Sequence, residues 1–238
     1  MLKKNLFLLI TILFTGGVYA QIIKSGDNTI DYTLIHPAHQ FYKNVTWDTL
    51  GNIKYEFMME NGIAIDSAKQ RITFSRSRQI PVGFMSADTS VTDLSFRPVS
   101  MHEVHIQQKR TYEMTFSASA ATVRKEFKGV VTNKTYPMNA GYFEDNMIEY
   151  IFGYLKLKKG ITYTLDNFNE ATGGNDPYSI KYAFDDSLDL PGYEQLNCSV
   201  LSFTHGATTG LIWIDKKTHD MIKQLGQFKG GTYVVVKL

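Results

Sequence analysis

The chain has 238 residues, with 25 basic and 23 acidic side chains and one cysteine, Cys198. This length suits one large domain or two small ones, and it allows a stable core without disulfide bonds. A single cysteine excludes an intramolecular disulfide, and nearly balanced charge gives no support for electrostatic binding to nucleic acid.

Residues 1–20 have the layout of a secretory signal peptide. A basic start with Lys3 and Lys4 precedes the apolar run Leu6–Leu13, and small residues close the segment at Val18–Ala20. The apolar run is too short to span a bilayer, which takes roughly 20 residues. We therefore expect cleavage after Ala20 and a periplasmic protein. The mature chain, residues 21–238, is expected to form a single β-rich domain without a transmembrane helix.

The mature chain favours β-strands, because it is rich in Tyr, Phe, Thr, Val and Ile, and glycine-containing turns separate its apolar segments. Two polar segments, 86–93 and 167–177, are predicted as loops. Short links join the last four predicted strands, which is typical of an antiparallel meander. The predicted strands are residues 41–48, 53–59, 70–76, 91–96, 101–107, 111–117, 121–127, 130–134, 161–166, 178–184, 194–203, 210–215, 220–227 and 232–237.

One amphipathic helix is predicted over Asp145–Leu157. Asp145 is the expected N-cap, cations after the helix complement its dipole, and Gly160 ends it. The helix either packs its apolar face on a sheet as core or covers an apolar cavity as a lid. Its apolar residues at helical spacing are Met147, Ile148, Ile151, Phe152 and Leu155.

Cys198 alternates with the apolar residues Leu196 and Val200 in a predicted strand. This pattern predicts a buried structural thiol, with a reactive thiol or an intermolecular disulfide as the alternative.

Two histidine pairs are candidate metal ligands, His36 with His39 and His102 with His105. On a strand, residues three apart point to opposite faces, and zinc needs three or four converging ligands. The acidic segment 166–176 lacks the spacing of a calcium-binding EF-hand loop. The sequence therefore predicts neither a metal site nor a cofactor.

Catalytic motifs are missing from the sequence. It contains no Gly-x-Ser-x-Gly elbow, no phosphate-binding Walker loop and no dinucleotide-binding glycine pattern. We expect no catalytic residue and a non-enzymatic protein. A hydrolase of envelope polymers, with paired carboxylates brought together by the fold, is the less favoured alternative.

The C-terminal part resembles a known group of proteins. The segment Gly210–His219, which contains Trp-Ile-Asp, is followed by the strand-like segment Met221–Leu225. In the segment Leu157–Leu165, a leucine, two lysines and a glycine lead into a predicted strand. These features resemble a family of uncharacterised periplasmic domains of Gram-negative bacteria. That family is similar in architecture to the lipoprotein carriers LolA and LolB. The resemblance covers roughly Phe143 to Leu238.

The resemblance implies a half-barrel whose concave face holds lipid under a helical lid. We therefore predict a mainly β fold, an antiparallel open or half-closed barrel with one packed amphipathic helix. The predicted function is binding of an apolar, lipid-like ligand or of an envelope partner, such as a lipid, a lipoprotein or another envelope protein. An assembly protein with a filled barrel is the alternative. The predicted ligand-binding residues, all on the lid helix, are Met147, Ile151, Phe152 and Leu155.

Overall fold

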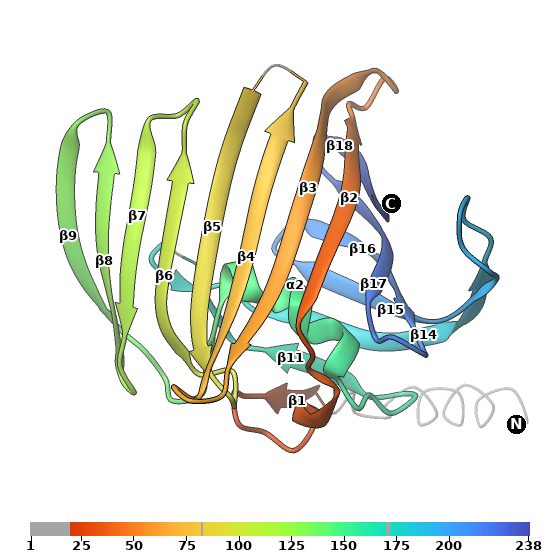
Figure 1. Cartoon of the computed structure of the whole chain (residues 1–238), viewed down its shortest axis with the longest axis horizontal. Coiled ribbons are helices and arrows are strands. Elements are labelled where there is room, and N and C mark those ends of the chain that lie inside the picture. The colour runs from red at the N-terminus through yellow and green to blue at the C-terminus, as the bar shows by residue number, and fades with distance from the viewer. Residues whose placement is uncertain (1–19, 82, 170–171) are drawn as a thin grey trace, which may run out of the picture.

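The computed structural model describes residues 20–81, 83–169 and 172–238, so the predicted signal peptide lies outside the described residues except for Ala20. One sheet of fifteen strands dominates the molecule and curves into an open half-barrel (Figure 1). All neighbouring strands in it are antiparallel, apart from the parallel pair β1 and β11. The prediction of a mainly β, antiparallel, half-closed barrel is confirmed.

Across the large sheet, the strands are β1 (Ala20–Ile23), β11 (Thr162–Leu165), β14 (Tyr178–Leu188), β15 (Leu196–His205), β16 (Thr208–Asp215), β17 (Met221–Phe228), β18 (Gly231–Lys237), β2 (Ala38–Trp47), β3 (Ile53–Asp66), β4 (Arg71–Ile80), β5 (Gly83–Asp93), β6 (Pro98–His105), β7 (Arg110–Phe116), β8 (Ala120–Phe127) and β9 (Val130–Pro137). A small sheet contains β10 (Phe143–Glu144), β12 (Asn167–Asn169) and β13 (Gly174–Asn175). The predicted meander of the last four strands is confirmed as β15–β18.

Both segments predicted as polar loops contain strands. Residues 86–93 belong to β5, in which Ser86, Asp88 and Ser90 are buried. Their alternation places them on the concave face of the sheet, where polar residues are unexpected. The segment 167–177 holds β12 and β13.

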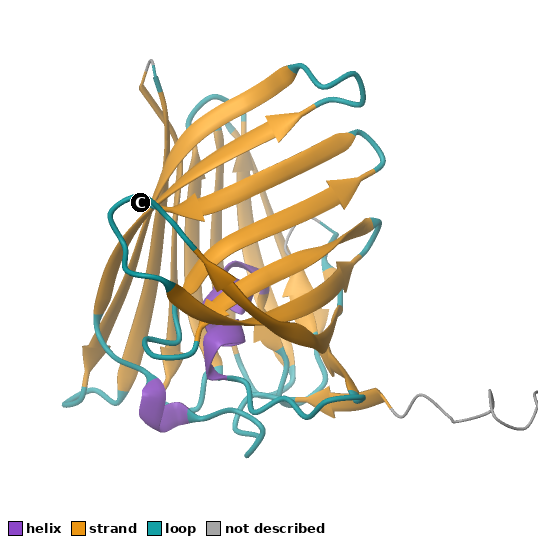
Figure 2. Cartoon of the chain, turned by 90° about the vertical axis from the view of Figure 1, so that its right-hand side faces the viewer, coloured by secondary structure: helices purple, strands orange, loops and turns teal. Residues whose placement is uncertain are grey.

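A short helical segment lies inside the curve of the sheet (Figure 2). It consists of η2 (Asp145–Met147), α2 (Ile148–Ile151) and η3 (Phe152–Tyr154), and a separate 3₁₀ turn, η1, covers Tyr32–Leu34. We use "helical segment" for residues 145–154.

The predicted helix, Asp145–Leu157, begins where the helical segment begins, but its C-terminal end and its N-cap, Asp145, are wrong. The N-cap is Glu144, whose carboxylate accepts a hydrogen bond of 2.9 Å from the Asn146 amide. The helical segment ends at Tyr154, before the lysines and Gly160. The reason is a non-local contact: the Lys156 amide donates to the Thr29 carbonyl at 2.8 Å, which holds the chain extended.

Apolar side chains form three buried clusters. The largest lies on the concave side, where Met147, Ile148 and Ile151 of the helical segment have no exposed surface. A second cluster lies on β6–β8. The third lies on the opposite face of β15–β17 and contains Cys198, so the prediction of a buried thiol is confirmed.

Candidate functional site

A row of buried polar side chains crosses the concave face of β3–β6. Asn61 of β3 lies directly opposite Arg76 of β4, and Arg76 lies opposite Asp88 of β5. The row continues from Asp88 to Glu103 of β6. All four residues are at most 8% exposed. Buried charges are costly unless paired, so the partners of these groups determine what the row does.

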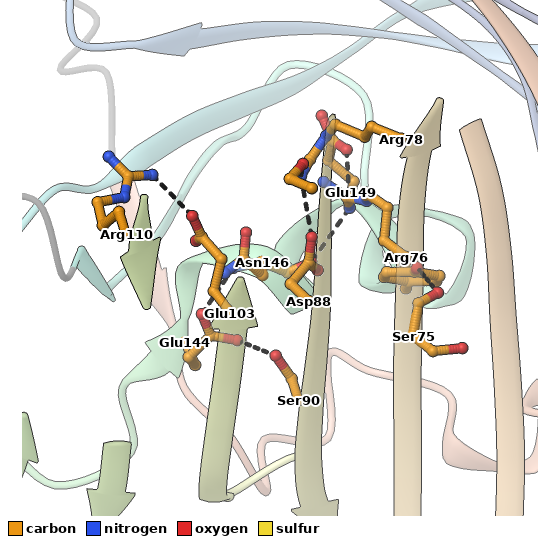
Figure 3. A network of polar contacts seen from close by, with 12 residues as sticks. Ser75, Arg76, Arg78, Asp88, Ser90, Glu103, Arg110, Glu144, Asn146 and Glu149 are labelled. Carbon is orange, nitrogen blue, oxygen red and sulfur yellow. Dashed lines mark hydrogen bonds and ion pairs between the residues drawn. The ribbon is translucent and has the colours of Figure 1, made fainter. Parts of the chain in front are cut away.

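Arg76 connects this row to the helical segment (Figure 3). Its Nη2 lies 3.0 Å from the Glu149 carboxylate and donates to the Asn146 carbonyl at 3.1 Å. On the same strand, the Ser75 carbonyl accepts a hydrogen bond of 2.7 Å from the Tyr150 hydroxyl. These contacts fasten the helical segment to β4.

The other charges of the network are paired on the sheet itself. Arg78 Nη1 lies 3.0 Å from Asp88 Oδ2, and Arg110 Nη2 lies 2.7 Å from Glu103 Oε1. Burial raises the pKa of Asp88, although Arg76 and Arg78 act in the opposite direction. One further contact ties the helical segment to β5, because Ser90 donates a hydrogen bond to Glu144.

The arginine at the centre of the network stays cationic. Burial acts most strongly and lowers the pKa of Arg76, but Glu149 and Asp88 together raise it above its ordinary value. The carboxylates of Asp88, Glu103 and Glu149 each face an arginine. The network is therefore a compensated set of charges that positions the helical segment.

An apolar pocket of about 210 Å³ lies on the other side of the helical segment, against β14–β16. Two of the four predicted ligand-binding residues line it, Phe152 and Leu155. The other two, Met147 and Ile151, are fully buried in the core and do not line it. The lining residues are Phe152, Gly153, Leu155, Leu157, Tyr182, Ser199, Leu201, Ile214, Asp215, Lys216 and His219.

Charged groups stand at the edge of this apolar pocket. Lys216 Nζ lies 2.6 Å from Asp185 Oδ1, and Lys159 Nζ lies 5.1 Å from the centre of the Tyr182 ring. Hydrogen bonds from Lys216 and Tyr182 lower the pKa of Asp185. The site thus combines apolar walls with ammonium and carboxylate groups, an arrangement suited to an amphiphile.

Sequence reasoning missed most of this site. Leu201 and Ile214 come from strands far along the chain from the helical segment, and no local pattern joins them. One feature of the sequence does indicate the polar row: Arg76 lies on the same strand face as the apolar residues Ile72 and Phe74. That alternation predicts an inward-pointing arginine.

The described ranges contain no group of three or more His, Cys, Asp or Glu residues that could hold a metal ion. In the same part of the chain, no helix is long and apolar enough to cross a membrane.

Comparisons with known proteins agree with this architecture. A family model described as "Protein of unknown function (DUF3108)" matches residues 40–236. A crystal structure of a β-barrel-like protein, a domain of unknown function DUF1849 from Brucella abortus, superposes with a TM-score of 0.54 at 8% identity. The match covers 85% of this chain and 95% of that chain, and it shows the fold alone. No curated protein matches the sequence.

Proposed function

Since the chain belongs to the DUF3108 family, whose function is unknown, we propose its function from its own site: it is a non-enzymatic binding protein of the bacterial envelope that takes an apolar, lipid-like ligand. The apolar pocket beside the helical segment carries this proposal. It lies beside the helical segment, the element proposed to act as a lid, and charged groups at its edge can hold the polar end of an amphiphile.

The pocket volume limits what can bind. At about 210 Å³ it is smaller than the roughly 300–1,000 Å³ of sites for drug-sized ligands. It therefore holds a short acyl chain or the end of a longer one, and each methylene removed from water contributes about 0.8 kcal/mol. A larger ligand requires the helical segment to move, against the contacts that Arg76 and Tyr150 make.

The envelope location rests on the signal-peptide pattern of residues 1–20. Expression of the whole chain in a Gram-negative host tests it by the intact mass of the periplasmic product. We expect a product that begins at Gln21. Recovery of the uncleaved chain from the cytoplasm would contradict the location.

Ligand binding is tested by displacement of a fluorescent fatty acid with saturated fatty acids of increasing chain length. In the variant Leu201→Trp, an indole should fill the pocket and exclude about two methylenes of the ligand. This loss should weaken binding by roughly tenfold or more. Thr204→Trp, an exposed position on the same strand, is the matched control. Circular dichroism and thermal unfolding establish that both variants fold.

Two results would contradict the proposal. One is the absence of fatty-acid binding by the wild-type protein. The other is unchanged binding by a folded Leu201→Trp variant. If Leu201→Trp does not fold, Leu155→Trp tests the same pocket from the chain that follows the helical segment, at a half-buried position.

A second candidate function, an interaction or assembly protein, is favoured by a different observation. The helical segment fills the interior beside it with fully buried side chains, including Met147, Ile148 and Ile151. An assembly protein needs no cavity, and its partner would bind an exposed surface. The native mass of the periplasmic protein separates the two candidates: a co-purified lipid supports the first, and a co-purified protein supports the second.

A further inference from the structure

One end of the half-barrel carries an unusual surface, which we call the upper rim. It is formed by the β2–β3, β6–β7 and β8–β9 hairpin ends at the top of Figure 1 and by the β17–β18 turn, which the pairing of Thr232 with Trp47 brings to the same end. We define it as residues 48–58, 106–110, 127–131 and 228–230, so the β4–β5 turn at this end is not part of it. Most of the large apolar side chains that are exposed in the described ranges lie on it. Leu50 is 85% exposed, Val130 65% and Ile53 60%. The others are Tyr55, Met58, Ile106, Phe127 and Val131.

The hairpin ends at the opposite end of the same strands expose far fewer large apolar side chains. They consist of residues 67–70, 93–97 and 117–119. Within these three described turns, Leu94, at 36%, is the exposed large apolar side chain. Single exposed apolar residues are normal on a protein surface, whereas a group of them at one end indicates a contact surface.

Each hairpin end of the upper rim also places a lysine beside its apolar side chain. Lys54 follows Ile53, Lys109 stands in the turn after Ile106, and Lys128 follows Phe127. Lys128 Nζ lies 5.1 Å from the centre of the Phe127 ring. The same order recurs at the end of β17, in Phe228 and Lys229.

The acidic residues of the rim already have partners. Asp48 accepts hydrogen bonds from two amides of its own turn, those of Leu50 and Asn52. Glu56 pairs with Lys43 at 2.7 Å, and Glu126, which immediately precedes the rim, pairs with Arg124 at 3.5 Å. Asp48 keeps its negative charge, but the rim carries Lys54, Lys109, Lys128 and Lys229, so the net charge that it presents is basic.

A wide groove of about 970 Å³ opens at the same end, between the β6–β7 and β8–β9 hairpins. Its walls combine the apolar residues Ile106 and Phe127 with Lys109 and Lys128. Arg110 and Glu126 also line it, and each is paired with a group of opposite charge, Glu103 and Arg124. The groove thus has room for an anionic headgroup next to apolar side chains.

We propose that the upper rim docks on a bilayer surface that contains anionic lipids. Its apolar side chains enter the interface, and the lysine stems lie along them with their ammonium groups at the lipid phosphates. Tyr55 suits this depth because its ring is apolar and its hydroxyl is polar. Docking at the rim is independent of ligand binding in the apolar pocket.

Flotation of the purified exported protein with lipid vesicles tests the proposal. We expect binding to vesicles of phosphatidylglycerol and phosphatidylethanolamine, weaker binding at high salt, and little binding to phosphatidylcholine vesicles. The double variant Ile53→Ser with Phe127→Ser should reduce the bound fraction by roughly tenfold. Both positions are exposed, so the fold should be retained, which thermal unfolding checks.

The control Leu94→Ser removes an exposed apolar side chain at the opposite end and should bind vesicles like the wild type. The pocket variant Leu201→Trp should also bind them, which separates failure of rim docking from failure of ligand binding. Absence of binding to anionic vesicles, or equal binding by the double variant, would overturn the proposal. Rim-dependent capture of a protein without vesicle binding would overturn it in favour of a protein partner.

Discussion

Gly153 determines how closely the helical segment packs against the turn between β16 and β17. A Cβ atom at this position would stand 1.8 Å from the carbonyl oxygen of His219, in the turn between β16 and β17. The clash is with backbone, which cannot turn aside as a flexible side chain can. The helical segment therefore packs against that turn only because residue 153 lacks a side chain.

We predict that Gly153→Ala lowers the free energy of unfolding by about 1–3 kcal/mol, as expected for overpacking. Gly174→Ala is the control, because a Cβ there has no heavy atom within 4 Å and its backbone is not left-handed. Urea unfolding of both variants measures the difference. Equal stability of the two variants would show that the turn yields without cost.

Cys198 gives a second test at the residue scale. Burial raises the pKa of its thiol to about 11, and the nearby carboxylates of Asp215 and Asp186 act in the same direction. Because the thiolate is the reactive species, the native protein should not react with Ellman's reagent at mildly alkaline pH. Unfolding in urea should release one reactive thiol, and rapid reaction of the native protein would contradict its burial.

At the scale of elements, the ion pair between Arg76 and Glu149 is the principal charged link between sheet and helical segment. Arg76 is 6% exposed and Glu149 25%, so the pair is only partly screened by solvent. Removing one partner of a buried pair leaves the other charge uncompensated, which is strongly destabilising.

We predict that Arg76→Met costs about 3 kcal/mol of stability, the lower end of the range for a fully buried pair. Hydrogen exchange should quicken at the amides of α2 and η3. Lys69→Met breaks the exposed pair with Asp66 and should leave the stability nearly unchanged, because solvent screens that pair. If Arg76→Met costs as little as this control, the network does not hold the helical segment.

Local patterns predict the strands well and the contents of the concave face poorly. The strands β15–β18 have alternating apolar residues and short links, and both are properties of neighbouring residues. Polar composition predicts a loop for most of β5, but Ser86, Asp88 and Ser90 are buried in the strand and point inward to partners on other elements. The end of the helical segment depends on Thr29, which is distant in sequence from Lys156.

Local patterns predict the candidate site only in part, as they do the concave face. Helical spacing groups Phe152 and Leu155 in one predicted helix, whereas Leu155 lies in extended chain just after the helical segment. The same spacing also groups them with Met147 and Ile151, which are core. Which apolar side chains border a hollow depends on Leu201 and Ile214 across the fold, and helical periodicity contains no information about them.

At the scale of the whole molecule, the two proposals concern different places on one sheet. The apolar pocket lies inside the curve, between the helical segment and β14–β16, and the upper rim is the edge formed by the hairpin ends. A protein that docks on a bilayer by its rim would bring the concave face near its source of amphiphiles. The two events can be tested separately, because Leu201→Trp should weaken ligand binding alone and the Ile53→Ser with Phe127→Ser variant should weaken vesicle binding alone.

Fully and partly buried tyrosines make the stability of the whole fold sensitive to alkaline pH. Burial raises the pKa of Tyr32, Tyr142 and Tyr154 to about 12, and it raises the pKa of Tyr42 and Tyr178 still further. A folded-state pKa above the unfolded value of 10 means that the neutral phenol is favoured in the folded state. This contribution is fully present below pH 10 and is lost as the pH rises through about 12.

We predict that the unfolding midpoint in urea falls steeply between pH 10 and 12, with tyrosinate absorbance appearing together with unfolding. Tyr154 is 4% exposed, and a shift of about two units corresponds to roughly 2–3 kcal/mol at full ionisation. Tyr154→Phe keeps the ring and removes the ionisable hydroxyl, so it should flatten this decline while changing stability little at neutral pH. A decline of the same steepness in Tyr154→Phe would show that ionisation of this phenol does not drive alkaline unfolding.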